Sequence, residues 1–365
     1  MSDLLDLRPE PQGRTRPRRR LPRAVGVLLV LAVFVGLLVG AVIGARTLLS
    51  SFSGGTPDYT GVGTGEVLVQ VRPGDSAGNI ATALLDKDVV KSGAAFRKAA
   101  AADDRSRSIQ PGFYRLRMQM SGNEAVALLL DPASRARSRV TVPEGSTVAV
   151  ALERLAQGTE LPIGDLQAAV ADPAALALPD YAGGQAEGFL FPATYDIEPG
   201  TSAAEALRQM VERFGAAASS VDLENRAPAI GRTPYEVLIT ASLIEKETAF
   251  AADRPKVARV VYNRLAAGMA LQFDSTVNYI RTEKKARLTL DDLKQESDYN
   301  TYENVGLPPT PIDSPGEAAL DAALTPASGD FLYFVTTSKD GSSLFTADYQ
   351  EFLHAKAKAQ REGVY

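Results

Sequence analysis

The sequence predicts an α+β protein built in parts: an apolar anchor segment, a small strand-and-helix domain and a larger mixed domain. Two observations support this prediction. Short alternating apolar segments, typical of strands, occur between segments of helical periodicity over most of residues 66–365. In addition, residues 24–45 carry no charge at all. A chain of 365 residues is long enough for two or three domains.

The amino terminus has the features of a membrane anchor. Residues 24–45 are apolar, and at about 1.5 Å per residue a helix of that length crosses a bilayer core. Residues 1–23 hold seven arginines against three acidic residues, and positive charge stays on the cytoplasmic side. We therefore expect a single-pass cell-membrane protein with a cytoplasmic tail at 1–23. A Gly/Ser/Thr-rich linker at 46–65 would lead to an extracytoplasmic body.

The composition restricts the possible chemistry. The net charge is −5, and the tail contributes +4, which leaves −9 for the rest of the chain. An acidic body argues against a nucleic-acid partner. Cysteine is absent and His354 is the single histidine, which excludes thiol nucleophiles and multi-histidine metal sites. Carboxylates are therefore the candidate catalytic groups.

Residues 66–131 predict a small βααβ domain followed by one more helix. The predicted order is a strand at 66–71, two helices, a strand at 111–116 and a helix at 121–130. The first helix places three apolar residues on one face, Ile80, Leu84 and Leu85. The same plan recurs in residues 138–212, with an insertion expected within 157–186. The alternative is that strand–turn–helix is a common local pattern without a repeat.

The last region, 233–365, contains the main acid–base candidate. Thr233 to Glu236 predicts a helix start with a capping box, and the apolar segment that follows predicts a buried helix. Glu245 shares one stripe with Leu238 and Ala241, so desolvation would favour its acid form. The alternative is a solvated helix end, at which Glu247 pairs with an arginine such as Arg254.

The rest of this region predicts further short elements. A helix begins near Asp253 and ends at Gly268, and Gln272, Asp274 and Thr276 then form a polar cluster that either binds ligand or caps a short helix. Residues 282–297 are charged and expected to be an exposed flap. A capping box at 314–317, a hairpin at 331–346 and a terminal helix at 348–361 complete the prediction.

Five motifs occur in an order that resembles one known family. They are Glu245-Lys246-Glu247-Thr248, Asn263-Arg264-Leu265, Gln272-x-Asp274-x-Thr276, Tyr299-Asn300-Thr301-Tyr302 and Gly306-Leu307-Pro308-Pro309. In this order they resemble the endolytic murein transglycosylases, the YceG-like family. Glu187-Gly188 and the strand at 333–335 fit as well. The strand–turn–helix unit of residues 66–131 resembles the LysM modules that bind cell-wall glycans.

The resemblance implies a membrane-anchored lyase that cuts nascent peptidoglycan strands at N-acetylmuramic acid and leaves 1,6-anhydro ends. It implies that Glu245 is catalytic and that no metal or organic cofactor is needed. It also implies glycan polymerases and division proteins as partners. The substrate would be held by five polar residues: Gln272, Asp274, Thr276, Asn300 and Tyr302. Phe273 and Ser275 depart from the family pattern, which puts the details of the subsites in doubt.

Two other functions stay open from the sequence. The chain could be a non-catalytic wall-binding scaffold of the cell-wall synthesis machinery, in which the repeated domains bind glycan. It could also be a hydrolase that uses Glu245 with a second carboxylate, Glu247 or Asp274, because hydrolytic glycosidases use two carboxyl groups.

Overall fold

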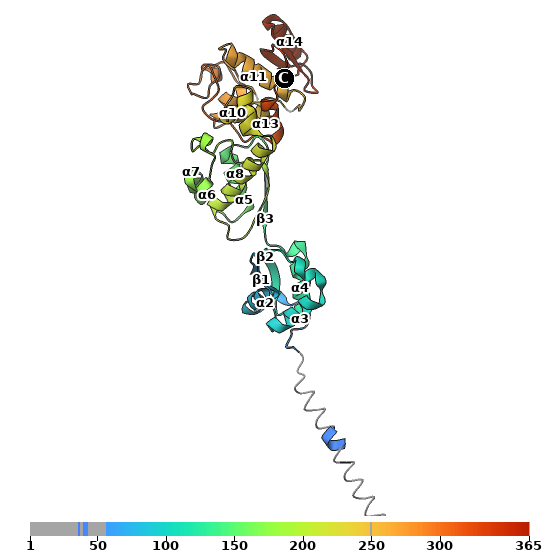
Figure 1. Ribbon diagram of the computed structural model, residues 1–365. Helices are drawn as coiled ribbons and strands as arrows, with labels where there is room; N and C mark the ends of the chain where they lie inside the picture. Colours follow the sequence, from blue (N-terminus) through green and yellow to red (C-terminus); the bar gives the residue numbers. More distant parts are fainter. Residues whose placement is uncertain (1–35, 37–38, 43–55, 249, 286, 365) are drawn as a thin grey trace, which may run out of the picture. The chain divides into compact units, whose positions relative to one another are not determined.

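The computed structural model describes residues 36, 39–42, 56–248, 250–285 and 287–364 (Figure 1). The expected membrane span at 24–45 lies almost entirely outside these residues. Within the described part of the chain, no helix is long and apolar enough to cross a membrane. The fold is mixed α+β and mostly helical, and its described sheets each have two strands. The predicted fold class is correct for this part of the chain.

The chain divides into two compact units. Unit 1 takes the described residues within 1–69, 74–109 and 116–130, and unit 2 takes 70–73, 110–115 and 131–365. The elements of the first region are β1 (Thr64–Val71), α2 (Ala77–Asp86), α3 (Gly93–Ala102), β2 (Gly112–Met118) and α4 (Gly122–Leu130). Strand β1 pairs with β2. The element order is the predicted βααβ followed by a helix.

One side chain of α2 does not face the core as expected. Ile80 and Leu84 are buried, whereas Leu85 is 46% exposed. Consecutive residues of an α-helix are about 100° apart around its axis, so Leu85 points away from the face that Ile80 and Leu84 share. The prediction that Leu85 lies on the buried stripe is wrong for this reason.

The first part of unit 2 has the same strand–helices–strand–helix order as unit 1, with one more α-helix in the connection between its strands. Strands β3 (Ser138–Val142) and β4 (Ala193–Ile197) pair antiparallel, with Val140 opposite Tyr195. The connection contains α5 (Val148–Gly158), α6 (Ile163–Val170) and α7 (Pro173–Leu176), and β4 leads into α8 (Ala203–Ser220). Helices α6 and α7 fall in the segment where the sequence predicted an insertion.

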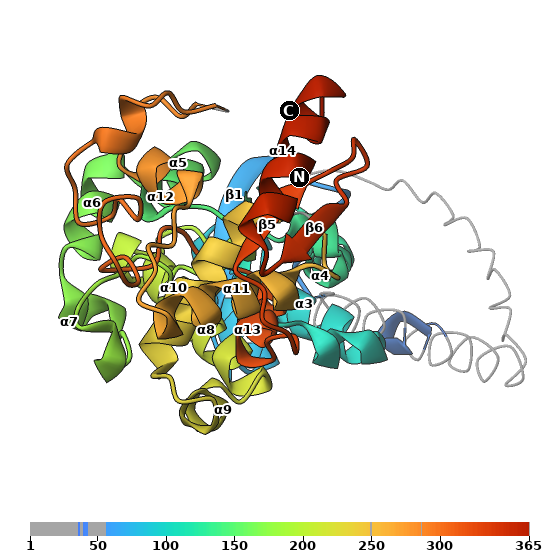
Figure 2. The same ribbon diagram turned by 90° about the horizontal axis from the view of Figure 1, so that it is seen from above.

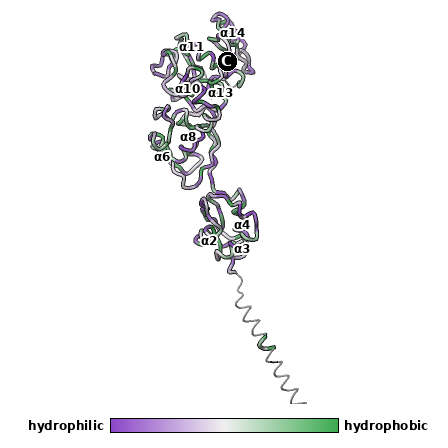
Figure 3. Tube along the Cα trace, in the orientation of Figure 1, coloured by the Kyte–Doolittle hydropathy of each residue, from purple (hydrophilic) through white to green (hydrophobic). Residues whose placement is uncertain are grey.

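The second part of unit 2 is organised around α10 (Pro234–Glu247). Its neighbours are α9 (Leu223–Ala229), α11 (Arg254–Ala266), α12 (Asp274–Tyr279) and α13 (Glu317–Leu324). A hairpin of β5 (Tyr333–Thr336) and β6 (Ser343–Thr346) packs on the terminal helix α14 (Tyr349–Arg361) (Figure 2). His354 is exposed on α14. Hydrophobic and hydrophilic residues alternate along these elements (Figure 3), as expected for helices that bury one face.

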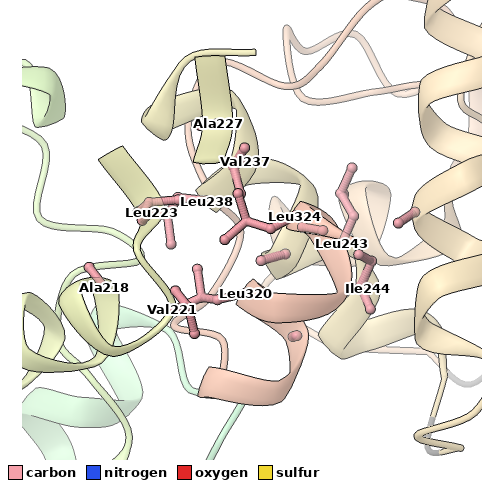
Figure 4. Packing of buried hydrophobic residues seen from close by; sticks show 14 of the residues in the cluster. Ala218, Val221, Leu223, Ala227, Val237, Leu238, Leu243, Ile244, Leu320 and Leu324 are labelled. Carbon is pink, nitrogen blue, oxygen red and sulfur yellow. The ribbon is translucent and has the colours of Figure 1, made fainter. Parts of the chain in front are cut away.

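Helix α10 starts and packs as the sequence predicts. The Thr233 hydroxyl accepts a hydrogen bond from the Glu236 N–H at 3.1 Å, and the Glu236 carboxylate accepts one from the Thr233 N–H at 2.8 Å. This confirms the capping box. Every residue from 237 to 244 is buried. Figure 4 shows Leu238 and its neighbours packed with Leu320 and Leu324 of α13. Burial on all sides of residues 237–244 leaves the two ends of α10 as the places where it meets polar groups, and Glu245 lies at the carboxyl-terminal end.

One local prediction is wrong. Helix α13 begins after Gly316 without a side-chain cap, so the predicted capping box from Ser314 does not form. Ser314 instead pairs through its backbone with Ser146, a distant partner that local residue patterns do not reveal. The expected exposed flap at 282–297 is confirmed for most of its described residues. Its one buried described residue is Asp292, which pairs with Arg281 and Lys285 at 2.7 and 2.9 Å.

Truncating the core beside α10 should destabilise unit 2. We expect Leu238→Ala to lower its free energy of unfolding by about 2–5 kcal/mol, since the side chain is fully buried and leaves a cavity. Urea unfolding measures the change. Leu290→Ala is the matched control, because Leu290 is 77% exposed. Equal losses for the two variants would contradict this account of the core.

Candidate active site

Glu245 lies in the last turn of α10, and its side chain is only 9% exposed. Its Oε1 is 3.5 Å from Nη2 of Arg254, and its Oε2 accepts a hydrogen bond of 3.2 Å from the Gly316 N–H. The carboxylate is therefore held between a guanidinium and the start of α13. Both groups favour its charged form. Arg254 forms this ion pair with Glu245, and not with Glu247 as the alternative prediction had it.

A loop from the first part of unit 2 reaches the same place. Lys246 Nζ donates a hydrogen bond of 2.5 Å to the Gly145 carbonyl, which lies just after β3. The backbones of residues 145–146 and Ser314 exchange two more hydrogen bonds of 3.0 and 2.9 Å. These contacts join the segment after β3 to the segment before α13. A site at the end of α10 is thus assembled from three separated parts of the sequence.

Asp313 is a second carboxylate beside Glu245. Its side chain is 0% exposed, and neither oxygen has a hydrogen-bond partner among the described residues. Its Oδ2 lies 3.6 Å from Lys246 Nζ. Burial, with a smaller contribution from the charges of Glu245 and Glu187, raises the pKa of Asp313 to about 8 against the opposing charge of Lys246.

Glu187 is a third carboxylate near the loop after β3. Its two oxygens accept hydrogen bonds from the Val148 N–H at 3.0 Å and from the Tyr279 hydroxyl at 3.1 Å. Burial raises the pKa of Glu187 to about 7, against these hydrogen bonds and the charge of Lys246. The site therefore gathers several carboxyl groups around one lysine. Perturbed carboxyls of this kind are characteristic of functional sites.

A cavity of about 400 Å³ opens beside this cluster. Its lining comes mainly from the end of α10 and from α12 and the segment after it: Thr147, Lys246, Glu247, Asp274, Ser275, Asn278, Tyr279, Lys284, Lys285 and Ile312. Burial raises the pKa of Glu247 to about 7, and the charge of Asp274 adds to this effect. Glu247 and Asp274 contribute to the lining, and Glu245, the residue before Lys246 in α10, does not.

Three of the five predicted substrate-binding residues are exposed or partly exposed: Gln272, Asp274 and Tyr302. Asp274 is exposed and accepts a hydrogen bond of 2.6 Å from the Tyr302 hydroxyl. Gln272 is exposed, has a positive φ of 55°, and donates its N–H to the Thr301 carbonyl at 2.9 Å. The structure brings the polar segment before α12 together with the segment 299–302.

The other two, Thr276 and Asn300, are fully buried and bonded within the protein. The Thr276 hydroxyl bonds with the Phe273 carbonyl and the Thr301 hydroxyl at 2.8 and 2.9 Å. The Asn300 amide donates to the carbonyls of Leu293 and Gln295, at 2.8 Å each. In this arrangement they hold the loops that carry Asp274 and Tyr302. Direct contact of Thr276 and Asn300 with substrate stays a prediction.

The sequence did not predict the roles of three charged residues of the site. Glu187 belongs to a family motif without an assigned role, and Arg254 was predicted as a partner of Glu247. Asp313 has no signal in the sequence, because it follows a proline-rich stretch without periodicity. Only its burial beside Lys246 reveals it.

Together, the fold and the site define a mixed α+β protein with a buried carboxylate cluster suited to acid–base chemistry. The chain belongs to the YceG-like family, whose model matches residues 69–358. This confirms the resemblance inferred from the five ordered motifs.

Relatives with assigned names support the same assignment. A Bacillus subtilis protein named endolytic murein transglycosylase is 33% identical over 80% of this chain and 84% of its own length. A Streptococcus pneumoniae protein of the same name is 30% identical over 78% of this chain, but over only 56% of its own length. A crystal structure of a yceG-like protein from Listeria monocytogenes has 29% identity and a TM-score of 0.54, covering 80% of this chain and 98% of that one.

The raised pKa of Glu187 predicts a pH-dependent effect on stability. The pKa of Glu187 is about 7 in the folded protein, above its unfolded value, so the folded state favours the protonated carboxyl. This contribution to the free energy of unfolding is complete below about pH 4.5 and is lost as the pH rises through 7. Glutamine does not titrate, so Glu187→Gln lacks this pH dependence. We expect wild type to lose about 2–3 kcal/mol relative to the variant between pH 4.5 and 8.

Urea unfolding at intervals across this pH range measures the difference. Glu212→Gln, at an exposed position of α8, controls for the removal of one acidic side chain. A wild-type-minus-Glu187→Gln difference that stays constant with pH would contradict the assignment.

Proposed function

We propose that this protein is a membrane-anchored lytic transglycosylase that cuts nascent peptidoglycan strands internally and thereby terminates glycan elongation. The observation that carries the proposal is Glu245: a carboxyl at the end of a buried helix, beside a polar cavity, in the position of the family's catalytic motif. The names of the relatives support the substrate class. Residues 24–45 would supply the anchor and place the site outside the cytoplasm.

In the proposed reaction, Glu245 acts first as an acid. It donates its proton to the glycosidic oxygen that follows N-acetylmuramic acid, and the bond from that oxygen to C1 breaks. The leaving sugar keeps the proton as a hydroxyl, and positive charge develops at C1. The Glu245 carboxylate formed in this step is stabilised by Arg254 and the Gly316 N–H, which already bind it.

The second step uses the same carboxylate as a base. Glu245 takes the proton of the C6 hydroxyl of the same N-acetylmuramic acid, and the C6 oxygen bonds to C1. The product is a 1,6-anhydro end, and Glu245 regains its proton. No water is consumed, and the step needs no second carboxylate, metal or organic cofactor. This is the chemical difference from hydrolysis, in which two carboxyl groups act on the bond and on water.

The cavity beside Glu245 would bind the sugar chain. Asp274 and Tyr302 offer a carboxylate and a hydroxyl already oriented by their mutual hydrogen bond, and Gln272 adds an exposed amide. These groups suit the hydroxyl and acetamido substituents of peptidoglycan. We propose glycan polymerases and division proteins as partners on the basis of the family, and no nucleic acid.

One observation favours a second candidate function. Glu247 lines the cavity together with Asp274, and burial raises the pKa of Glu247 to about 7, a value suited to a general acid. A hydrolase that uses Glu247 with Glu245 or Asp274 would release reducing ends in place of anhydro ends. A wall-binding scaffold would bind strands and release nothing.

Glu245→Gln should abolish release of anhydro-ended fragments from purified glycan strands, lowering the rate at least about 100-fold, because the proton donor and acceptor is lost. Mass spectrometry of the digest measures the products. Glu236→Gln in the same helix is the matched control, since glutamine preserves the capping box. Glu247→Gln tests the second acid candidate in parallel.

The outcomes separate the three functions. Anhydro ends from wild type and Glu236→Gln, but not from Glu245→Gln, support the proposal. Reducing ends from wild type support the hydrolase. If Glu247→Gln loses activity and Glu245→Gln does not, Glu247 is the acid. If wild type binds strands and releases no product, the result supports the non-catalytic scaffold.

Tyr302→Phe should weaken substrate binding. The variant keeps the ring but loses the hydroxyl that orients Asp274, and a hydrogen bond to a charged group contributes about 1.5–3 kcal/mol. We expect KM to rise about tenfold with a smaller change in kcat. Tyr349→Phe, at an exposed position of α14, is the control. An unchanged KM would remove Tyr302 from the binding site.

A further inference from the structure

Three lysines line the cavity beside Glu245, and their charges are compensated to different degrees. Lys246 belongs to the last turn of α10, and Lys284 and Lys285 follow α12. Lys285 Nζ donates to both carboxylate oxygens of Asp292 at 2.9 Å, so its charge is matched by a full negative charge. Lys284 forms no ion pair among the residues that the structure describes. The cavity wall therefore carries positive charge that these residues do not neutralise.

Lys284 is held at this wall by the backbone. Its Nζ donates hydrogen bonds to the carbonyls of Asn278, Tyr279 and Arg281 at 2.7, 3.0 and 2.9 Å. Carbonyl oxygens carry no net charge, so they orient the ammonium group and leave its unit charge in place. The alternative is that Lys284 only caps α12, because a lysine at the carboxyl-terminal end of a helix is stabilising without any ligand.

The charged groups of the cavity fall into two sets. Glu247 and Asp274 form one set, because burial and the charge of Asp274 raise the pKa of Glu247. Lys246 and Lys284 form the other, because burial and the charge of Lys246 lower the pKa of Lys284. Two ammonium groups that repel each other raise the free energy of the protein, and a bound anion would offset the repulsion. The two lysines are therefore a candidate anion subsite.

Peptidoglycan carries anions close to the bond that Glu245 would cleave. N-acetylmuramic acid bears a lactyl group on C3, and the stem peptide is attached to the lactyl carboxyl. The peptide contributes carboxylates of its own, and a strand without peptide keeps the lactyl carboxylate. Lys246 follows Glu245 directly in α10. A branch on the sugar whose C1 meets Glu245 is thus within reach of the cavity that Lys246 lines.

We propose that Lys246 and Lys284 form a subsite for a carboxylate on the lactyl branch of N-acetylmuramic acid, and that this subsite makes charged strands the preferred substrate. The inference rests on the proposed function, because it takes Glu245 as the point of cleavage. Lysine suits a flexible branch, since its ammonium is a compact point charge with rotatable donors. Lys284 would exchange one of its three carbonyl acceptors for the carboxylate.

The test compares three preparations of the same glycan strands. One carries its stem peptides, one has the peptide carboxyls converted to amides, and one has the peptides removed and keeps only the lactyl carboxylate. We expect kcat/KM of wild type for anhydro-end release to be about tenfold higher on peptide-bearing strands than on amidated strands. In Lys284→Met this ratio should fall to about twofold or less. The peptide-free strands show which carboxylate is bound: cleavage at the charged rate identifies the lactyl carboxylate, and cleavage at the amidated rate identifies the peptide.

The controls separate charge from helix capping. Lys284→Arg keeps the charge and should keep most of the preference. Lys294→Met removes the same charge from the same segment at a position that is 71% exposed and outside the cavity lining, so its ratio should equal that of wild type. The preference of wild type should also shrink as added salt screens the exposed lysine.

A binding measurement does not depend on cleavage. N-acetylmuramyl-L-alanyl-D-isoglutamine has one carboxylate and no bond to a second sugar, so calorimetry can compare it with its amide. We expect wild type to bind the acid about tenfold more tightly than the amide, and Lys284→Met to bind the two alike.

Each outcome bears on one proposal. A substrate preference and a binding preference that are both lost in Lys284→Met support the subsite. Equal preferences in wild type and Lys284→Met overturn it and leave the proposed function standing, as does a variant that loses the same fraction of its activity on all three preparations, because Lys284 then only caps α12. A wild type that releases no anhydro ends overturns the proposed function, and the binding preference alone then decides whether the subsite exists.

Discussion

The packing of α10 on all sides sets the conditions for the rest of unit 2. Its eight buried residues, 237–244, lie among α9, α11, α12 and α13, so the middle of the helix is apolar on all sides and its polar groups gather at its two ends. Glu245 comes directly after this segment. Its carboxyl is consequently kept from bulk water, and its charge depends on Arg254 and the Gly316 N–H.

The loop after β3 brings further charged and polar groups to the same site. Lys246 binds the Gly145 carbonyl and lies beside Asp313, so one ammonium serves two parts of the chain. Burial raises the pKa of Asp313 and of Glu187, the charges of Glu245 and Glu187 add to the effect on Asp313, and Lys246 opposes the rise at both groups. A change at any one of these charges is therefore expected to be felt by the others.

Local patterns were sufficient for most of the elements. The capping box at Thr233, the apolar segment of α10 and the hairpin at 333–346 all form, because each depends on residues close in sequence. The capping box expected at Ser314 depends on a distant partner. The backbone of Ser314 pairs with that of Ser146, and α13 begins only after Gly316, so the Ser314 hydroxyl does not reach the first turn of the helix.

The sequence by itself determined that carboxylates are the available catalytic groups, that α10 is buried and that the five ordered motifs belong to one family. Tertiary structure alone decided which groups surround Glu245. Arg254 reaches it from the start of α11 and Gly316 from the start of α13, and only folding sets the distances on which charge interactions depend. The sequence places Glu245 on an apolar helix stripe, and the tertiary structure adds its two contacts, Arg254 and the Gly316 N–H.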